Sequence, residues 1–463
     1  MEQITINLIK KATVERNYRQ ILMKFISILA LALFLLHPLP GLAETDGTVT
    51  LTDSVKGAVG HHAQIKAFVS NRQAINRNLA AALGRFFPSL DLTSRYGFQK
   101  YNNQNARRTG IEGRTRTASD STVTLTQNVF DGLERISDYL GSKARLTSAE
   151  YRLIDNVETV SLDAIRAHVD VVRLRKLVNL AKENVTAHQE VLESIAERVA
   201  GGAGSLADEM QARGRVARAE TTLITYRGEL QTAEAQYLRM VGVEPGALAD
   251  LEFEQQLTPH DLPSFMEAVL KDNPKVRVYQ AEVEAKREDK GMTTSTMMPN
   301  VDIEVSSRYT DQLDGSESYL RDDRAMLALS WNLFSGTSDY QRVRAAQARV
   351  QEAQANLQDT LDEMGRQAST TWTEYTTSLG QVEKHQEALQ YSMESRDMYL
   401  MQFNVGQRSL LDVLDSINEV FSNSVQLETA ISNRDFTVYK FLALEGSLLK
   451  SLDIAEAAYE SGR

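Results

Sequence analysis

Two carboxylates toward the end of the chain, Asp412 and Asp415, are the residues whose type and spacing best suit joint chemistry. Side chains three positions apart on an α-helix lie on one face. If that face lined a threefold axis, six carboxylates would meet at a constriction. Charges about 6 Å apart repel by roughly 3 kcal/mol at an effective dielectric of about 20, and a ring of them attracts cations. From composition alone, two solvated surface charges are the simpler interpretation.

Catalysis and nucleic-acid binding are not indicated. The sequence has no His-Glu-x-x-His zinc motif, nucleophile elbow or phosphate-binding loop. It contains no cysteine, which excludes disulfides and thiolate metal sites. Its net charge of −11 argues against a nucleic-acid partner. We therefore expect a protein that is not an enzyme and that needs no metal or cofactor.

The first 43 residues have the pattern of a secretory signal peptide. Arg19 and Lys24 supply positive charge, residues 25–36 form an apolar run, and small residues follow. This run is shorter than the roughly 20 residues that a membrane-spanning helix needs, so a membrane anchor is the less favoured alternative. The signal is complete from Met23, which is therefore a second candidate for the first residue. We expect an exported mature chain.

The chain is an internal duplication, in which landmark residues recur at an offset of 204. Leu125, Asn128, Phe130 and Gly132 recur as Leu329, Asn332, Phe334 and Gly336; Gly202, Ser205, Leu206 and Asp208 recur as Gly406, Ser409, Leu410 and Asp412; Gly242 recurs as Gly446. Pro88 matches Pro299 at an offset of 211. Each half therefore has the same parts in the same order.

Long helices must connect these landmarks. No proline lies between Pro88 and Pro245. About 70 residues separate Gly132 from Gly202, enough for a helix of about 105 Å. Strong helix formers and a thin, Ala-rich apolar stripe favour a coiled-coil wall. A return helix of about 40 residues follows each turn, and another helix of about 35 residues is expected to run to Pro299.

These elements divide the chain into five parts. They are a signal peptide (1–43), a first repeat (44–246), an equatorial linker (247–262), a second repeat (263–449) and a C-terminal tail (450–463).

Four short segments alternate apolar and polar residues over about 10 positions, which is the pattern of outer-membrane strands. Their apolar residues are Leu90, Leu92, Tyr96 and Phe98; Val123, Leu125 and Val129; Val301, Ile303, Val305 and Tyr309; and Leu327, Leu329, Trp331 and Leu333. Half-buried strands of a soluble sheet are the alternative. Four strands are too few to close a barrel, and an open edge in lipid leaves backbone groups unpaired. We therefore expect three copies and 12 strands, with loops 105–120 and 311–323 outside the cell.

The duplicated plan and the stretch Phe403-Asn-Val-Gly-Gln-Arg-Ser-Leu-Leu-Asp-Val-Leu-Asp415 resemble the TolC family of outer-membrane channel-tunnels. The resemblance covers about residues 48–450. It implies a mixed α and β fold, in which a homotrimer builds a 12-stranded barrel in outer-membrane lipid. The barrel would be continuous with a long α-helical coiled-coil tunnel in the periplasm.

The resemblance also implies roles for residues near the second turn. Asp412 and Asp415 match the family's narrow entrance ring, and Arg408 and Asp208 match a latch between the inner and outer coiled coils. Phe403 stands where the best-known member has a tyrosine, so one hydroxyl contact of the latch is missing. From the residues alone, Arg408 has another partner in Asp412, one helical turn away, although a base N-terminal to an acid is the weaker order.

Both glycine-marked turns are implied docking sites for a periplasmic adaptor. The residues concerned are Gly202, Gly204, Ser205, Leu206, Val405, Gly406, Ser409 and Leu410. The alternative is simple helix reversal, for which glycine suffices.

The sequence of residues 405–412 resembles most closely that of the branch that works in type I protein secretion, including adhesin export. That branch implies a periplasmic adaptor, an inner-membrane ABC transporter and an exported protein as partners. Multidrug efflux, with an RND pump and small molecules, is the alternative within the family. Many drug-efflux members carry a lipidated N-terminal cysteine, and this chain has none. A periplasmic coiled-coil adaptor is the alternative from another class, but it would not explain the four alternating segments.

Overall fold

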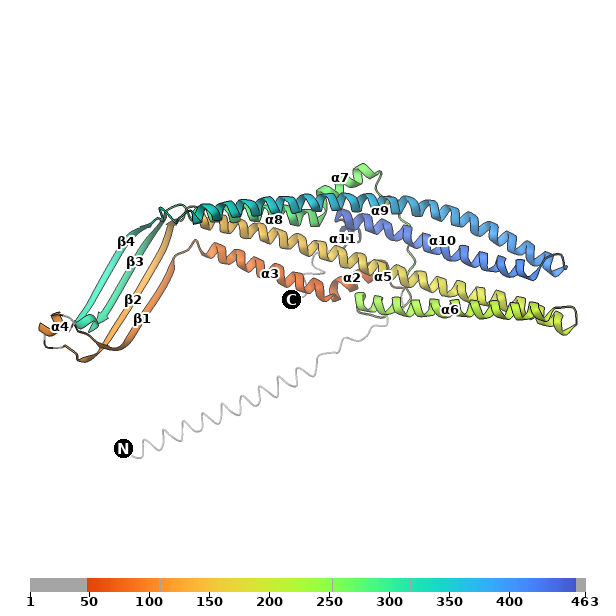
Figure 1. Ribbon diagram of the computed structural model, residues 1–463, viewed down its shortest axis with the longest axis horizontal. Coiled ribbons are helices and arrows are strands. Elements are labelled where there is room, and N and C mark those ends of the chain that lie inside the picture. The colour runs from red at the N-terminus through yellow and green to blue at the C-terminus, as the bar shows by residue number, and fades with distance from the viewer. Residues whose placement is uncertain are drawn as a thin grey trace, which may run out of the picture. The chain divides into compact units, whose positions relative to one another are not determined.

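The computed structural model describes residues 48–454 apart from positions 103, 109, 111, 252 and 317. Contacts group Val49–Arg463 into one unit and Met1–Thr48 into another. The predicted signal peptide and most of the predicted tail lie outside the described residues, so both stay predictions. Within the unit that begins at Val49, the strands lie at one end and the two helix-reversing turns at the other (Figure 1).

Four antiparallel strands form one sheet in chain order. They are β1 (Ser89–Lys100), β2 (Thr115–Phe130), β3 (Asn300–Asp311) and β4 (Tyr319–Ser330). The register places Leu125 of β2 between Leu90 of β1 and Val305 of β3. The predicted apolar residues that are paired in the four strands therefore share one face of the sheet. The register shifts between Asn128 and Phe130, so Phe130 and not Val129 lies opposite Val301. That face is open in a single chain, where Leu92 and Leu327 are each 71% exposed.

The fourth strand is shorter than its alternation predicts. It ends at Ser330, so the expectation that Trp331 and Leu333 lie in the strand was wrong. The indole N–H of Trp331 donates to the backbone carbonyl of Met297 at 3.1 Å. This bond ties the side chain to the segment before β3, at the base of the sheet, and the regular alternation stops there.

Two helices of 67 residues, α5 (Glu134–Ala200) and α9 (Ser338–Asn404), confirm the prediction of one very long helix in each repeat. At 1.5 Å per residue each extends about 100 Å. The return helices α6 (Leu206–Val241) and α10 (Leu410–Glu445) have 36 residues each. Helix α5 packs against both α6 and α10, and α10 packs against α9. Helices α6 and α9 are thus the two edges of a four-helix wall (Figure 1).

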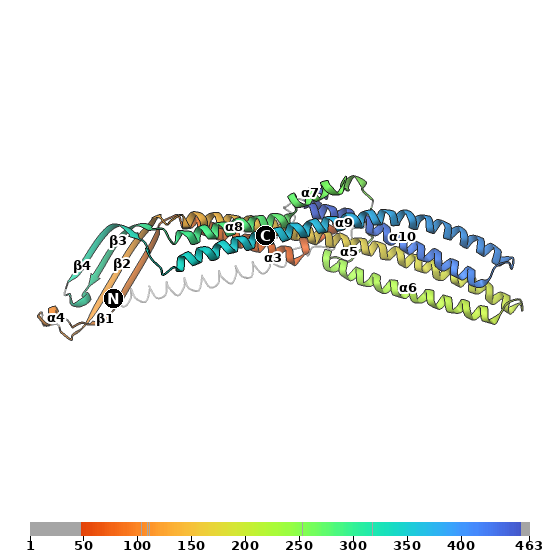
Figure 2. The same ribbon diagram turned by 45° about the horizontal axis from the view of Figure 1, so that its top comes forward.

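Shorter helices continue the wall toward the sheet. They are α2 (Leu51–His61), α3 (Ala63–Gly84), α7 (Leu262–Asp272) and α8 (Pro274–Ser295). The short elements η1 (Gln255–Leu257) and α11 (Leu448–Ser451) lie beyond α6 and α10 in the chain, whereas α4 (Gln104–Arg108) and η2 (Leu313–Gly315) lie in the loops that join β1 to β2 and β3 to β4. Helix α3 packs on α5, and α8 packs on both α5 and α9. Helix α7 stands beside α9 (Figure 2).

The single helix of about 35 residues expected before Pro299 is in fact two helices, α7 and α8. The break lies at Asn273 and Pro274. Proline has no N–H to donate, and it disfavours helical backbone at the preceding residue. The Asn273 side chain accepts hydrogen bonds from the N–H groups of Lys275 and Val276, which caps the new helix.

The duplication is repeated in the backbone conformation. The glycine pairs have positive φ: 66° and 65° at Gly132 and Gly336, 75° and 78° at Gly202 and Gly406, and 87° and 71° at Gly242 and Gly446. Positive φ explains why glycine recurs at these landmarks. Leu133 and Thr337, also 204 positions apart, take φ of 75° and 72° despite their side chains.

A buried polar chain anchors the segment after α6. The His168 Nε2–H donates to the carbonyl of Ala249 at 2.9 Å. His168 Nδ1 therefore accepts from the Ser54 hydroxyl at 2.9 Å, and the Ser54 oxygen accepts from the Tyr237 hydroxyl at 2.8 Å. Burial lowers the pKa of His168, which keeps the ring neutral. The chain of bonds joins α2, α5 and α6 inside the largest apolar cluster.

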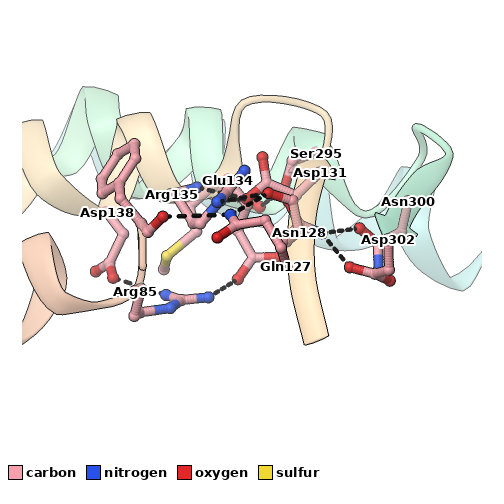
Figure 3. A network of polar contacts seen from close by, with 12 residues as sticks. Arg85, Gln127, Asn128, Asp131, Glu134, Arg135, Asp138, Ser295, Asn300 and Asp302 are labelled. Atoms are coloured by element: carbon pink, nitrogen blue, oxygen red, sulfur yellow. Dashed lines mark hydrogen bonds and ion pairs between the residues drawn. The ribbon is translucent and has the colours of Figure 1, made fainter. Parts of the chain in front are cut away.

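A second polar network lies where the helices meet the strands (Figure 3). Arg85, just after α3, donates to Glu134 and Asp138 of α5, in both cases at 2.7 Å. Asn128 of β2 donates to Asp302 of β3 at 2.8 Å. These bonds tie α3 to α5 and β2 to β3 at the point where both repeats change from helix to strand.

Candidate functional site at the helical turns

The two turns that reverse the long helices share one backbone motif. After α5, the Ala203 N–H bonds to the Arg198 carbonyl at 2.8 Å and the Gly202 N–H to the Val199 carbonyl at 3.0 Å. After α9, the equivalent bonds run from Gln407 to Gln402 and from Gly406 to Phe403. This is the Schellman motif, whose glycine takes a left-handed conformation. We call the end of the unit that holds these turns the tip.

The predicted docking residues differ in their exposure. Gly202, Gly204, Ser205, Leu206, Val405, Gly406 and Ser409 are exposed, whereas Leu410 is buried. Leu206 and Val405 present the larger apolar surface, at 68% and 69% exposed. Ser205 and Ser409 cap the return helices, because their hydroxyl groups accept from the N–H groups of Ala207 and Asp412.

Leu410 packs inside the tip rather than on its surface. It belongs to an apolar cluster with Val191, Ile195, Phe403, Val413, Leu414 and Ile417. The Leu410 side chain is therefore buried in the single chain, and its contact with a partner stays a prediction. Leu410 is the first residue of α10, and its side chain points between α10 and α5.

The presence of phenylalanine at position 403 is accounted for by its contact with Arg198. The phenyl ring is buried, and the Arg198 guanidinium lies over it, 4.5 Å from the ring centre. The same guanidinium contacts the Asn404 side-chain oxygen at 3.4 Å. A cation over an aromatic face is worth about 0.5–1 kcal/mol at an exposed site. Arg198 thus joins the α5–α6 hairpin to the α9–α10 hairpin without the hydroxyl group that a tyrosine would supply.

The structure brings Arg408 to Asp412 and not to Asp208. Arg408 Nε lies 3.1 Å from a carboxylate oxygen of Asp412, the partner that the alternative predicted, but Arg408 lies in the turn before α10 and not inside a helix. The guanidinium also stacks on the Tyr399 ring, 3.9 Å from its centre. The Nε–H forms no aligned hydrogen bond. Within the described part of the chain, Asp208 has no ion pair.

Asp415 has a partner that the sequence did not reveal. An Arg215 nitrogen on α6 lies 2.7 Å from the Asp415 carboxylate on α10. Nearby, the Tyr226 ring of α6 meets the Phe421 ring of α10 edge-on, with 6.5 Å between centres. No spacing rule within one helix could have found these pairs, since each joins residues about 200 positions apart.

The described residues contain no group of three or more metal-ligating side chains that could hold an ion. Between residues 48 and 454, no helix has both the length and the apolar character needed to cross a bilayer.

A family model described as "Outer membrane efflux protein" matches residues 55–243 and 266–438. The chain belongs to the outer membrane efflux protein family. The match covers both repeats and all four strands. It also includes α5, α6, α9 and most of α10.

Individual relatives have low sequence identity to this chain, but they align with most of its length. The chain is 22% identical over 401 residues to the outer membrane efflux protein BepC of Brucella suis, covering 86% of this chain and 85% of that one. It is 21% identical over 387 residues to the outer membrane protein TolC of Escherichia coli, covering 80% and 76%. The CmeC outer membrane channel of Campylobacter jejuni superposes with a TM-score of 0.76 at 15% identity, covering 89% of this chain and 90% of that one.

Family membership shows in which compartment each part of the fold lies. The protein is an outer-membrane efflux channel, in which the strands contribute to a β-barrel and the helices to a periplasmic tunnel. It is a transporter and not an enzyme. The tip, at the end away from the strands, is therefore the periplasmic end of the channel.

Proposed function

We propose that this chain is the outer-membrane channel of a type I protein secretion system, in which it acts with a periplasmic adaptor and an inner-membrane ABC transporter. The proposal rests on the sequence of residues 405–412. This sequence resembles that of the secretion branch, and these residues form the second turn of the tip. A cysteine-free chain also fits the non-lipidated branch.

The working assembly in this proposal is a homotrimer of 12 strands. In one chain β1 pairs only with β2 and β4 only with β3, so both outer strands of the described sheet have an unpaired edge. The β1 edge continues in α3 and α6, and the β4 edge continues in α9 (Figure 1). Exposed apolar residues lie on both edges, including Met210 and Ile224 on α6 and Tyr391 and Met398 on α9. Joining one edge to the other edge of the next copy closes a ring.

At the tip, we propose that Asp412 and Asp415 from three copies form the entrance ring. The Asp412→Asn/Asp415→Asn variant should then lose cation preference and block by multivalent cations in planar bilayers. Unchanged selectivity would remove the ring assignment. Leu206, Val405 and the exposed glycines are the surface we assign to the adaptor.

The latch between Arg408 and Asp208 remains a proposal for the closed assembly, in which Arg408 would exchange Asp412 for Asp208 of the facing coiled coil. Such exposed pairs are worth about 0–1 kcal/mol each, weak enough for a partner to break. Arg408→Ser should raise the conductance of the closed channel. An unchanged conductance would leave Arg408 with only its contact to Asp412.

Small-molecule efflux with an RND pump is the second candidate function, because BepC is named an efflux protein. The deciding experiment compares the secreted and surface proteome of a strain lacking the gene with that of its parent, and then with a complemented strain. Loss of one or a few large secreted proteins supports type I secretion and identifies the cargo. An unchanged proteome together with raised drug sensitivity would support efflux instead.

A further inference from the structure

The tip holds two kinds of ion pair, which respond differently to movement between helices. Arg408, in the turn before α10, pairs with Asp412 of α10, and Arg213 pairs with Glu209 within α6, both at i, i+4 spacing. Each of these pairs lies inside one hairpin and survives a rigid movement of that hairpin. The Arg215–Asp415 pair joins α6 to α10 and breaks when those helices separate.

Neither partner of this cross-helix pair has a substitute in its own helix. Three and four positions away from Arg215 lie Gln211, Ala212, Arg218 and Ala219. Three and four positions away from Asp415 lie Leu411, Asp412, Asn418 and Glu419. These neighbours offer Arg215 no carboxylate and Asp415 no cation. When α6 and α10 move apart, each charge is therefore left exposed to solvent.

We infer that Arg215 is a gate and selectivity residue that couples the charge of the entrance to its opening. This inference rests on the proposed entrance ring. In the closed arrangement Arg215 holds α10 to α6 and neutralises Asp415. Separation of the hairpins frees Asp415, whereas Arg408, which belongs to the same hairpin as Asp412, keeps Asp412 within reach. A trimer then gains three uncompensated carboxylates at its narrowest point, and the open entrance selects cations more strongly than the closed one.

The surroundings of the pair support a separable contact. The Arg215 side chain is 23% exposed and that of Asp415 is 56% exposed, so water reaches the carboxylate. Helix α10 packs mainly on α9 and also on α5, and α6 packs on α5. The ion pair and the Tyr226–Phe421 contact therefore reach across α5, and they can break while each hairpin stays packed within itself.

Planar-bilayer recordings of the full-length channel test the inference. Arg215→Gln should raise closed-channel conductance severalfold and increase the permeability ratio of K⁺ over Cl⁻, with stronger block by Mg²⁺. Arg213→Gln is the matched control, because it lies two residues away and loses only an intrahelical pair; both readouts should stay near wild type. Arg215→Asp with Asp415→Arg restores the pair in reverse and should return conductance toward wild type, whereas Arg215→Asp alone should not.

The outcomes separate this inference from the proposed function. If Arg215→Gln matches wild type while Asp412→Asn/Asp415→Asn changes selectivity, the ring stands and the role of Arg215 is wrong. If the double aspartate variant also leaves selectivity unchanged, the ring itself fails. Should Arg215→Gln not assemble, Asp415→Asn decides the matter, since loss of the same pair must also raise closed-channel conductance. An unchanged conductance there overturns the inference.

Discussion

Glu158 on α5 makes the stability of the helical wall depend on pH in an unusual direction. Its side chain is buried, one carboxylate oxygen accepts from the Leu449 N–H at 3.4 Å, and the other oxygen has no partner. Burial raises the pKa of Glu158 to about 8, from 4.5 in an unfolded chain. The folded state therefore holds a proton that the unfolded state releases. Stability from this group is complete below about pH 4.5 and is lost as pH rises toward 8.

The expected loss of stability follows from the difference between the folded and unfolded pKa values of Glu158. A difference of one pH unit between the two pKa values corresponds to about 1.4 kcal/mol, so the whole window amounts to about 5 kcal/mol per chain. Between pH 6.5 and 8 the loss is about 2 kcal/mol. Burial lowers the pKa of His168 in the folded chain, but the unfolded chain still releases part of its histidine protons just above pH 6.5. The carboxyl group is therefore isolated by comparing wild type with a Glu158 variant, in which the histidines are unchanged.

Glu158→Gln keeps the shape of the side chain and removes its titration. Thermal unfolding followed by circular dichroism at 222 nm, at constant detergent and salt, should show the wild-type Tm falling by a few degrees from pH 6.5 to 8. The Tm of Glu158→Gln should not fall across the same range. Glu150→Gln, an exposed position on the same helix, should follow wild type. Equal slopes for wild type and Glu158→Gln would refute the reasoning.

Two further predictions concern the same unfolding transition. His168 has a pKa lowered by burial, so its contribution is present above about pH 6.5 and is lost as pH falls through the folded pKa. His168→Phe should weaken this acid-side loss while costing about 1–3 kcal/mol at pH 7.5, because Ser54 and the Ala249 carbonyl lose a partner; an acid-side slope equal to wild type would contradict the assignment. Gly406 has a φ of 78°, so Gly406→Ala should destabilise by about 1 kcal/mol, whereas Gly380→Ala, in the interior of α9 with open space around it, should stabilise by about 0.5–1 kcal/mol. A stability change of the same sign at both glycines would show that backbone conformation is not the cause.

The sequence predicted the features that repeat. Three pairs of glycines spaced by 204 positions marked turns with positive φ, and the alternating segments placed the sheet and its apolar face, because both depend on local backbone geometry. The end of β4 was missed because Trp331 continues the alternation while its indole N–H bonds away from the sheet. The division of α7 from α8 was open to prediction, since Pro274 signals a helix start, but the helical composition on both sides concealed it.

The candidate site was predicted less completely, for a physical reason. The pairing of Arg408 with Asp412 was open to prediction because the two residues are four positions apart, although Arg408 lies in the turn before α10. Arg215 and Arg198 act across helices, so their partners depend on how the hairpins rotate about their axes. That rotation is set by packing of the cluster around Leu410 and Leu414, which periodicity does not encode.

The wall with two different edges has a genetic consequence. Each interface between neighbouring copies would join the α6 edge of one copy to the α9 edge of the next. A copy with a substitution at one edge then disrupts an interface even when both of its neighbours are unaltered. In a cell that makes normal and damaged chains in equal amounts, random assembly leaves only about one trimer in eight wholly normal. Substitutions on the exposed faces of α6 or α9 should therefore behave as dominant-negative alleles, whereas truncations that never assemble should be recessive.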